Sequence, residues 1–121
     1  MWKRLLVLGA CYCCWLSPSF AYTGNEMLPS CKRNALSAKT SREVYQWGQC
    51  MGMIDMLFQL GDALQPQLRF CSPQGSTLGQ ALDVVVQYLE RTPATRHLNF
   101  VILAQVALQD AWPCANKNPP N

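Results

Sequence analysis

The stretch from Thr77 to Arg91 reads TLGQALDVVVQYLER, and its apolar residues recur every three or four positions. This spacing is typical of a helix with one buried face. Thr77 and Gln80 have the types and spacing of a capping box, in which the hydroxyl and the amide each satisfy a backbone N–H at a helix start. We therefore expect a helix over Thr77–Arg91. Its expected buried face consists of Leu78, Leu82, Val85, Val86 and Leu89.

The segment that follows, TPATRHLNFVILAQVALQDAW, predicts a second helix directly after the first. Thr92 and Pro93 are typical of a helix start, and Pro113 would end the helix. We expect this helix over Pro93–Trp112. Its expected buried face consists of Leu98, Val101, Ile102, Leu108 and Trp112. Because the two helices are separated by only one or two residues, we expect them to form an antiparallel hairpin.

Two further capping boxes lie nearer the N-terminus, at Thr23–Glu26 and Thr40–Glu43. The second box predicts a helix over about Ser41–Leu64, with a buried stripe of Val44, Trp47, Met51, Ile54 and Phe58. The first helix begins either near Asn25 or only after Pro29, because a proline inside a helix costs a backbone hydrogen bond. No stretch alternates like a strand between turn residues. The sequence thus predicts an all-α fold, a small four-helix domain.

The first 21 residues resemble an export signal. A positive start, Lys3-Arg4, is followed by the mostly apolar residues 5–16 and by small residues at 19 and 21. A twelve-residue helix is about 18 Å long, too short for the roughly 30 Å hydrocarbon core of a membrane. We therefore expect a signal peptide over residues 1–21, cleavage after Ala21, and a periplasmic domain over residues 22–121.

Processing as a lipoprotein at Cys11 is an alternative to simple cleavage. Leu8-Gly9-Ala10-Cys11 resembles a lipobox, but the apolar run before Cys11 has only six residues, which is short for a signal core. Cleavage after Ala21 is the better supported expectation, and a retained membrane anchor is the least supported one.

Composition and charge restrict the classes of partner. Half of the 121 residues are hydrophobic and 14% are charged, which is a globular composition. The net charge of +3 falls to +1 from Tyr22 onward, where eight Lys/Arg stand against seven Asp/Glu. A nearly neutral domain lacks the electrostatic attraction that drives binding to nucleic acid or to anionic membranes. We therefore expect no nucleic-acid partner, and no membrane partner once the signal is removed.

Cysteine spacing predicts two disulfides. Three of the seven cysteines lie in the expected signal, which leaves Cys31, Cys50, Cys71 and Cys114. An even number in a small exported domain indicates disulfides, whereas zinc is disfavoured because these four cysteines form no Cys-x-x-Cys pair. The predicted hairpin brings Cys71 and Cys114 to one end, and Cys31 and Cys50 flank the connection between the first two helices. We expect the pairs Cys31–Cys50 and Cys71–Cys114.

The sequence shows no recognisable catalytic or metal-binding set, so we expect neither an enzyme nor a cofactor nor a metal site. His97, the only histidine, has no free thiol to activate if the cysteines are oxidised. Asp55 and Asp62 lie seven residues apart, on one face of the expected second helix. A solvated or ion-paired role is favoured for them over acid/base chemistry.

Residues 70–89 read FCSPQGSTLGQALDVVVQYL, and this segment resembles the central signature of the Rap/Tai family. The PATRH segment at residues 93–97, the closing residues up to Cys114, Gly24-Asn25 and Cys50-Met51-Gly52 also resemble that family. The resemblance covers residues 24–114. Rap/Tai proteins are immunity proteins against amidase effectors of type VI secretion.

The resemblance implies an exported, helical, disulfide-bonded and often dimeric protein that binds and blocks a peptidoglycan amidase. A homodimer is therefore one expectation. The best candidate for an exposed binding loop is Gln65–Gln74, because binding residues favour loops on a rigid scaffold, and a plain connector is the alternative. We expect its partner-binding residues to be Gln67, Arg69, Phe70 and Gln74.

Other interpretations remain open from the sequence. The turn over Arg91–Arg96 is the alternative binding surface. The alternative function is a small periplasmic chaperone or stress protein, although a single histidine gives little basis for a pH switch. An enzyme or a small-ligand carrier is the third possibility, and it lacks a recognisable set of residues.

Overall fold

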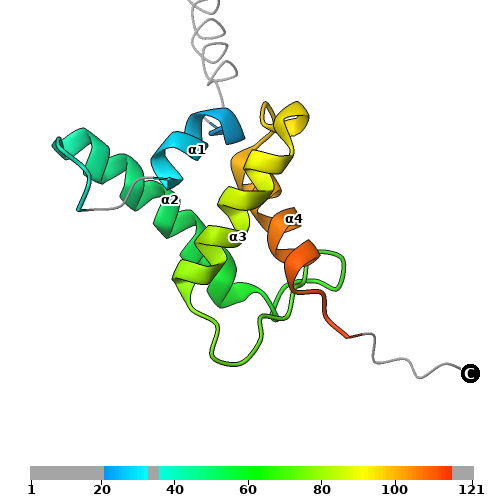
Figure 1. Ribbon diagram of the computed structural model, residues 1–121. Coiled ribbons are helices and arrows are strands. Elements are labelled where there is room, and N and C mark those ends of the chain that lie inside the picture. Colours follow the sequence, from blue (N-terminus) through cyan, green and yellow to red (C-terminus); the bar gives the residue numbers. More distant parts are fainter. Residues whose placement is uncertain (1–20, 33–35, 116–121) are drawn as a thin grey trace, which may run out of the picture.

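The computed structural model describes residues 21–32 and 36–115, which form a helical domain (Figure 1). These residues contain four α-helices and one 3-10 helix: α1 (Gly24–Cys31), α2 (Ser41–Leu60), α3 (Leu78–Arg91), η2 (Pro93–Thr95) and α4 (Phe100–Ala111). The only strand-like pairing within the described ranges is an isolated bridge between Thr23 and Asn99. The predicted all-α fold is confirmed. The expected export signal lies, up to residue 20, outside the described residues.

All three predicted capping boxes are present, and each begins a helix. In each box the threonine hydroxyl accepts a hydrogen bond from the backbone N–H three residues later, and the side chain of that residue accepts one from the threonine N–H. The pairs are Thr23 with Glu26, Thr40 with Glu43, and Thr77 with Gln80. Helix α3 starts and ends where the sequence predicts, with Thr77 as its N-cap.

Helix α1 begins at Gly24 and contains Pro29, so the earlier of its two predicted starts is correct. Its first turn is joined to the segment before α4 by two backbone hydrogen bonds. The N–H of Gly24 donates to the carbonyl of Leu98 at 3.1 Å, and that of Asn25 donates to the carbonyl of Arg96 at 2.9 Å. These bonds satisfy N–H groups that have no partner inside their own helix.

The predicted start of the fourth helix is wrong. The chain forms η2 at the predicted place, but α4 begins only at Phe100, with Asn99 as its N-cap. The Asn99 side chain accepts hydrogen bonds from the N–H groups of Val101 at 2.9 Å and Ile102 at 3.3 Å. The predicted helix over 93–112 is interrupted because the carbonyls of Arg96 and Leu98 accept hydrogen bonds from the start of α1. Such a long-range pairing is not visible in local periodicity.

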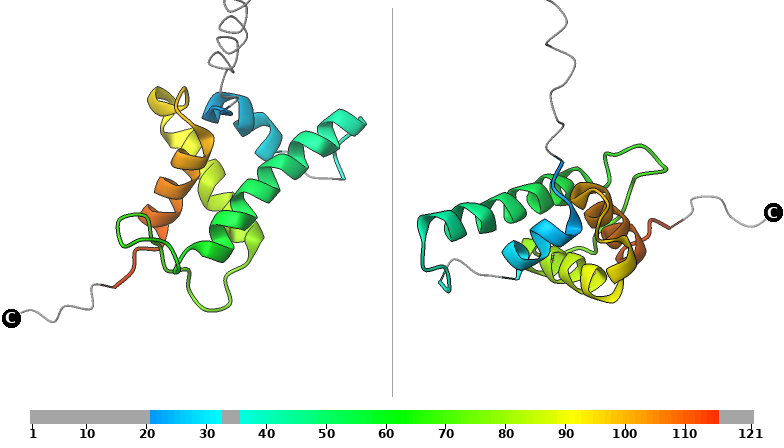
Figure 2. Two further views of the ribbon diagram at one scale, coloured as in Figure 1. Left: turned by 180° about the vertical axis from the view of Figure 1, so that it is seen from behind. Right: turned by 90° about the horizontal axis from the view of Figure 1, so that it is seen from above.

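The core lies where the four helices meet, and two of the predicted buried faces are displaced. On α2 the buried residues are Cys50, Ile54 and Leu57, whereas Val44 is exposed. No residue between 41 and 49 is buried, because this half of α2 projects beyond the other helices (Figure 2). On α4 the core side is formed by Phe100, Leu103, Ala104, Gln105, Ala107 and Leu108.

The face predicted for α4 is exposed over its first turn. Leu98, Val101 and Ile102 were expected in the core but are exposed, while Leu108 is buried as predicted. The sequence FVILAQVAL is apolar on nearly all sides, so its periodicity does not select one face.

Both predicted disulfides are present. Cys31–Cys50 joins α1 to α2 with a Cα–Cα distance of 5.4 Å, and Cys71–Cys114 joins the segment before α3 to the segment after α4 with a distance of 4.8 Å. Helices α3 and α4 lie side by side as an antiparallel hairpin, as expected, and α2 lies on the other side of α3 (Figures 1 and 2). The second disulfide therefore closes the open end of this hairpin.

Candidate functional site

The candidate binding loop starts at Gly61, because α2 ends at Leu60 and not at Leu64 as predicted. The Phe70 ring packs directly on Gly61, where an added Cβ would lie 2.6 Å from Phe70 Cε2. The N–H of Phe70 also donates to the Gly61 carbonyl at 3.2 Å. The chain thus leaves the helix at Gly61 and returns to the same point at Phe70, which makes residues 61–70 a closed loop.

Two glutamines of α4 hold this loop in place. The Gln105 side chain donates to the carbonyl of Leu68 at 2.6 Å, and the Gln109 side chain donates to the carbonyls of Gln67 at 2.9 Å and Arg69 at 3.4 Å. Gln105 is buried, so its amide is available to the loop and not to water. Sequence reasoning missed both residues. The available signal was a glutamine, Gln105, in the middle of an apolar helix face.

The predicted loop Gln65–Gln74 is in fact two loops on either side of Cys71. Cys71 is fixed by its disulfide and by its N–H, which donates to the Trp112 carbonyl at 2.9 Å. Beyond it a tight turn follows, in which the N–H of Ser76 donates to the Pro73 carbonyl at 3.0 Å and Gly75 adopts a φ of 86°. The two loops project in different directions in Figures 1 and 2. The structure therefore does not join all the predicted residues into one surface.

The four predicted partner-binding residues have different environments. Phe70 is fully buried in the core beside Trp112, with ring centroids 6.5 Å apart, so its assignment as a partner contact is corrected. Gln67 is exposed on the 61–70 loop, and Gln74 is exposed on the turn after Cys71. Arg69 is half-buried. Gln67, Arg69 and Gln74 remain candidates, whereas Phe70 has a packing role.

The alternative surface, the turn over Arg91–Arg96, is largely occupied by internal hydrogen bonds. The Arg96 guanidinium donates to the carbonyls of Leu89 and Glu90 and so caps the C-terminal end of α3. The exposed Arg91 is the only arginine of this turn that does not take part in that cap. This turn therefore offers fewer free donors than its sequence indicates.

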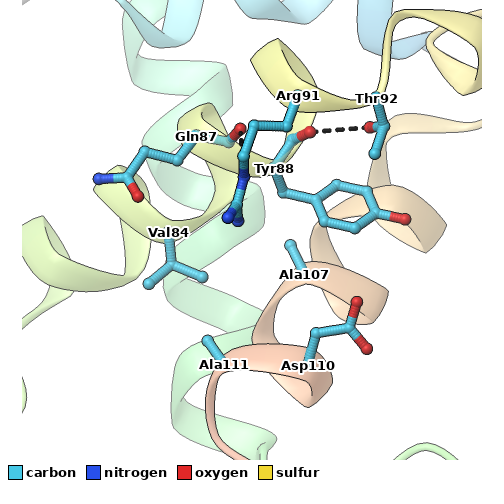
Figure 3. Close-up of a pocket in the computed structure, with 8 residues that line it drawn as sticks. All are labelled: Val84, Gln87, Tyr88, Arg91, Thr92, Ala107, Asp110 and Ala111. Carbon is cyan, nitrogen blue, oxygen red and sulfur yellow. Dashed lines mark hydrogen bonds between the residues drawn. The ribbon is translucent and has the colours of Figure 1, made fainter.

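A shallow groove of about 510 Å³ lies between α3 and α4 (Figure 3). Arg91 and Asp110 stand at its rim, Ala107 and Val84 lie along it, and the Tyr88 ring forms part of its wall. The Arg91 Nε donates to the Gln87 carbonyl at 3.3 Å, and the Thr92 hydroxyl donates to the Tyr88 carbonyl at 2.7 Å. The groove contains opposite charges but no nucleophile paired with a base.

Side chains that could support chemistry are dispersed. His97 is exposed in the turn after η2. Asp55 accepts from the Gln59 side chain at 2.9 Å on α2, whereas Asp62 lies beyond the end of that helix, so the expected common face does not exist. The described residues contain no group of three or more His, Cys, Asp or Glu side chains placed to bind a metal ion. Within the same ranges, no helix combines the length and apolar character required to cross a membrane.

The fold and the loop define a class of small disulfide-bonded helical domain that presents a fixed loop on a rigid scaffold. Residues 23–114 match the family of Rap1a immunity proteins, and the chain belongs to this family. The chain is thus assigned to immunity proteins, which bind a secreted effector. No curated protein and no solved structure gives a significant match.

Proposed function

We propose that this chain is a periplasmic immunity protein that binds and inhibits a peptidoglycan amidase effector delivered by type VI secretion. The observation that carries the proposal is the family match, which includes all four helices and both disulfides. The amidase target and the secretion route rest on the resemblance of residues 70–89 to the Rap/Tai signature.

The periplasmic location is supported by two independent features of the chain. Residues 1–21 have the pattern of a cleavable export signal. Two disulfides are also expected to persist only in an oxidising compartment, such as the bacterial periplasm.

Inhibition in this proposal requires binding alone, with no reaction carried out by the immunity protein. The loop over residues 61–70 is suited to this role because its ends meet at Gly61 and Phe70 and its middle is held by Gln105. A loop that is already ordered loses little conformational entropy on binding. Arg69 and Gln67 are its proposed contacts, and Gln74 adds a contact from the neighbouring turn.

An inhibition assay tests this function. Purified protein comprising residues 22–121, with its disulfides oxidised, is titrated against a panel of type VI amidase effectors while release of peptidoglycan fragments is measured. We expect one effector to lose its activity at an equimolar ratio. A housekeeping peptidoglycan amidase serves as the control and should keep its activity. Full activity of every effector at excess immunity protein would contradict the proposal.

A further inference from the structure

Four large apolar side chains are exposed at the start of α4, in the segment just before it and on the loop beside it. Their exposed fractions are 45% for Leu68, 44% for Leu98, 37% for Val101 and 57% for Ile102. Single exposed apolar residues are common and need no explanation, whereas a group of them marks an interaction surface.

These four residues lie on the 61–70 loop and around the start of α4. The Leu68 carbonyl accepts from the side chain of Gln105. Val101 precedes Gln105 by one turn of α4, which is about 5.4 Å along the helix axis. Leu98 precedes Ile102 by four residues and lies just before the N-cap of α4. The loop and the start of α4 thus carry four exposed apolar side chains, and we call Leu68, Leu98, Val101 and Ile102 the apolar strip.

A cation without a partner adjoins the strip. Arg69 follows Leu68, and its Nε is buried without a hydrogen-bond partner in the described structure. Among the described residues, no carboxylate lies within salt-bridge distance of its guanidinium. The neighbouring side chains that hold the loop, Gln105 and Gln109, are neutral. Asp110 lines the groove between α3 and α4 instead.

We propose that the apolar strip and Arg69 together form the surface on which the effector docks, an inference that rests on the proposed function. The effector segment that fits presents an apolar side chain flanked by a carboxylate. The apolar side chain covers Ile102 and Leu68, and the carboxylate pairs with the terminal guanidinium nitrogens of the half-buried Arg69, because its Nε is buried. A charge-assisted pair with arginine is stronger than a neutral hydrogen bond and adds orientation.

A second copy of the chain is a poorer occupant of this surface. A two-fold contact brings the same surface of both copies together. It would then cover Arg69 with a strip that contains no carboxylate, and burying an unpaired charge is costly. An acidic partner removes this cost. The charge of Arg69 therefore favours the effector over self-association.

Binding measurements with matched variants test the surface. The probes are catalytically inactive type VI amidase effectors from the producing strain and its competitors, and the protein is the oxidised domain over residues 22–121. Ile102→Ser removes apolar surface from the strip, and Arg69→Gln removes the charge. Met56→Ser is the control, because Met56 is 66% exposed on α2, away from the strip. Thermal unfolding and a thiol assay establish that each variant is folded and oxidised.

We expect Ile102→Ser and Arg69→Gln each to raise the Kd for the effector by at least about 10-fold, and Met56→Ser to change it by less than about 2-fold. The Kd of the unaltered protein should also rise more steeply with salt than that of Arg69→Gln, because a charge pair is screened by ions.

The outcomes separate this inference from the function on which it rests. If the unaltered protein binds no effector, the proposed function fails and the docking surface fails with it. If the unaltered protein binds an effector but Ile102→Ser and Arg69→Gln both bind it as tightly as the unaltered protein, only the docking surface is overturned. The docking surface is also overturned if analytical ultracentrifugation shows a dimer that Ile102→Ser converts to a monomer. The strip would then be a contact between two copies of the chain.

Discussion

Gly24 is the residue on which the contact between α1 and the start of α4 depends most directly. A Cβ at this position would lie 2.8 Å from Leu103 Cδ1 and 3.0 Å from both the Arg96 carbonyl oxygen and Leu89 Cδ2. The two side chains can shift, but the carbonyl belongs to the backbone segment that binds Asn25. The close approach of the two segments therefore requires glycine.

Replacing Gly24 by alanine should lower the free energy of unfolding by about 1–3 kcal/mol, the usual cost of overpacking a filled site. Denaturant unfolding of the oxidised protein measures the change. Gly48→Ala is the matched control, because a Cβ there meets no atom within 4 Å and alanine is the better helix former. Gly48→Ala should stabilise α2 by up to about 1 kcal/mol. Equal effects of the two substitutions would contradict this account of Gly24.

Glu26 links stability to pH. Its carboxylate accepts hydrogen bonds from the N–H of Thr23 at 2.8 Å and from the Thr23 hydroxyl at 2.9 Å. Both bonds lower the pKa of Glu26 below its ordinary value of 4.5, and the bond from the Thr23 backbone has the larger effect. The ionised carboxylate therefore stabilises the fold at pH values above 4.5, and this contribution is lost as the pH falls through the lowered pKa.

The pH prediction is tested with Glu26→Gln, whose amide can accept hydrogen bonds but does not titrate. The difference in free energy of unfolding between the unaltered protein and this variant should be constant near neutral pH and shrink as the pH falls below about 4.5. Denaturant titrations at a series of pH values give the difference. A difference that grows with acidification would have the wrong sign for a lowered pKa.

At the scale of single elements, α3 shows what local sequence signals determine. Its capping box, its apolar spacing and its terminal Arg91 agree with one another, and its bounds follow from them. Replacing Thr77 by alanine should lower the free energy of unfolding by about 1 kcal/mol, the usual effect of losing an N-cap. The exposed Thr77 lies apart from the apolar strip, so effector binding should not change. An unaltered denaturant midpoint would show that the cap does not stabilise α3.

The differences between sequence and structure lie in α2 and α4, where distant parts of the chain decide the outcome. Helix α4 starts late because Leu98 and Arg96 give their carbonyls to α1, and α2 ends at Leu60, next to the point where the Phe70 ring packs on Gly61. Distant parts of the chain also determine the candidate site. Arg69 and Gln67 were predicted in the loop, but burial of Phe70 and support of the loop from α4 depend on tertiary contacts.

For the whole molecule, the two disulfides supply stability that the small hydrophobic core of such a domain does not provide. In the chain-entropy model, links that span 19 and 43 residues stabilise by about 3 and about 4 kcal/mol. The double variant Cys71→Ser/Cys114→Ser should therefore lose about 4 kcal/mol, a large part of the roughly 5–15 kcal/mol typical of a domain. Denaturant unfolding at equal protein concentration gives this value. A loss smaller than that of the Cys31→Ser/Cys50→Ser variant would contradict the predicted order.

Protection of living cells tests the central claim most directly. Cells that direct a type VI amidase effector to their periplasm co-produce either the full chain or a chain that lacks residues 2–21, and survival is counted. The account predicts that the full chain restores survival, whereas the shortened chain, which lacks the expected export signal, does not. Immunoblots should first show that both chains accumulate to similar levels. Cell death despite an exported full chain, with every effector of the panel, would contradict the account.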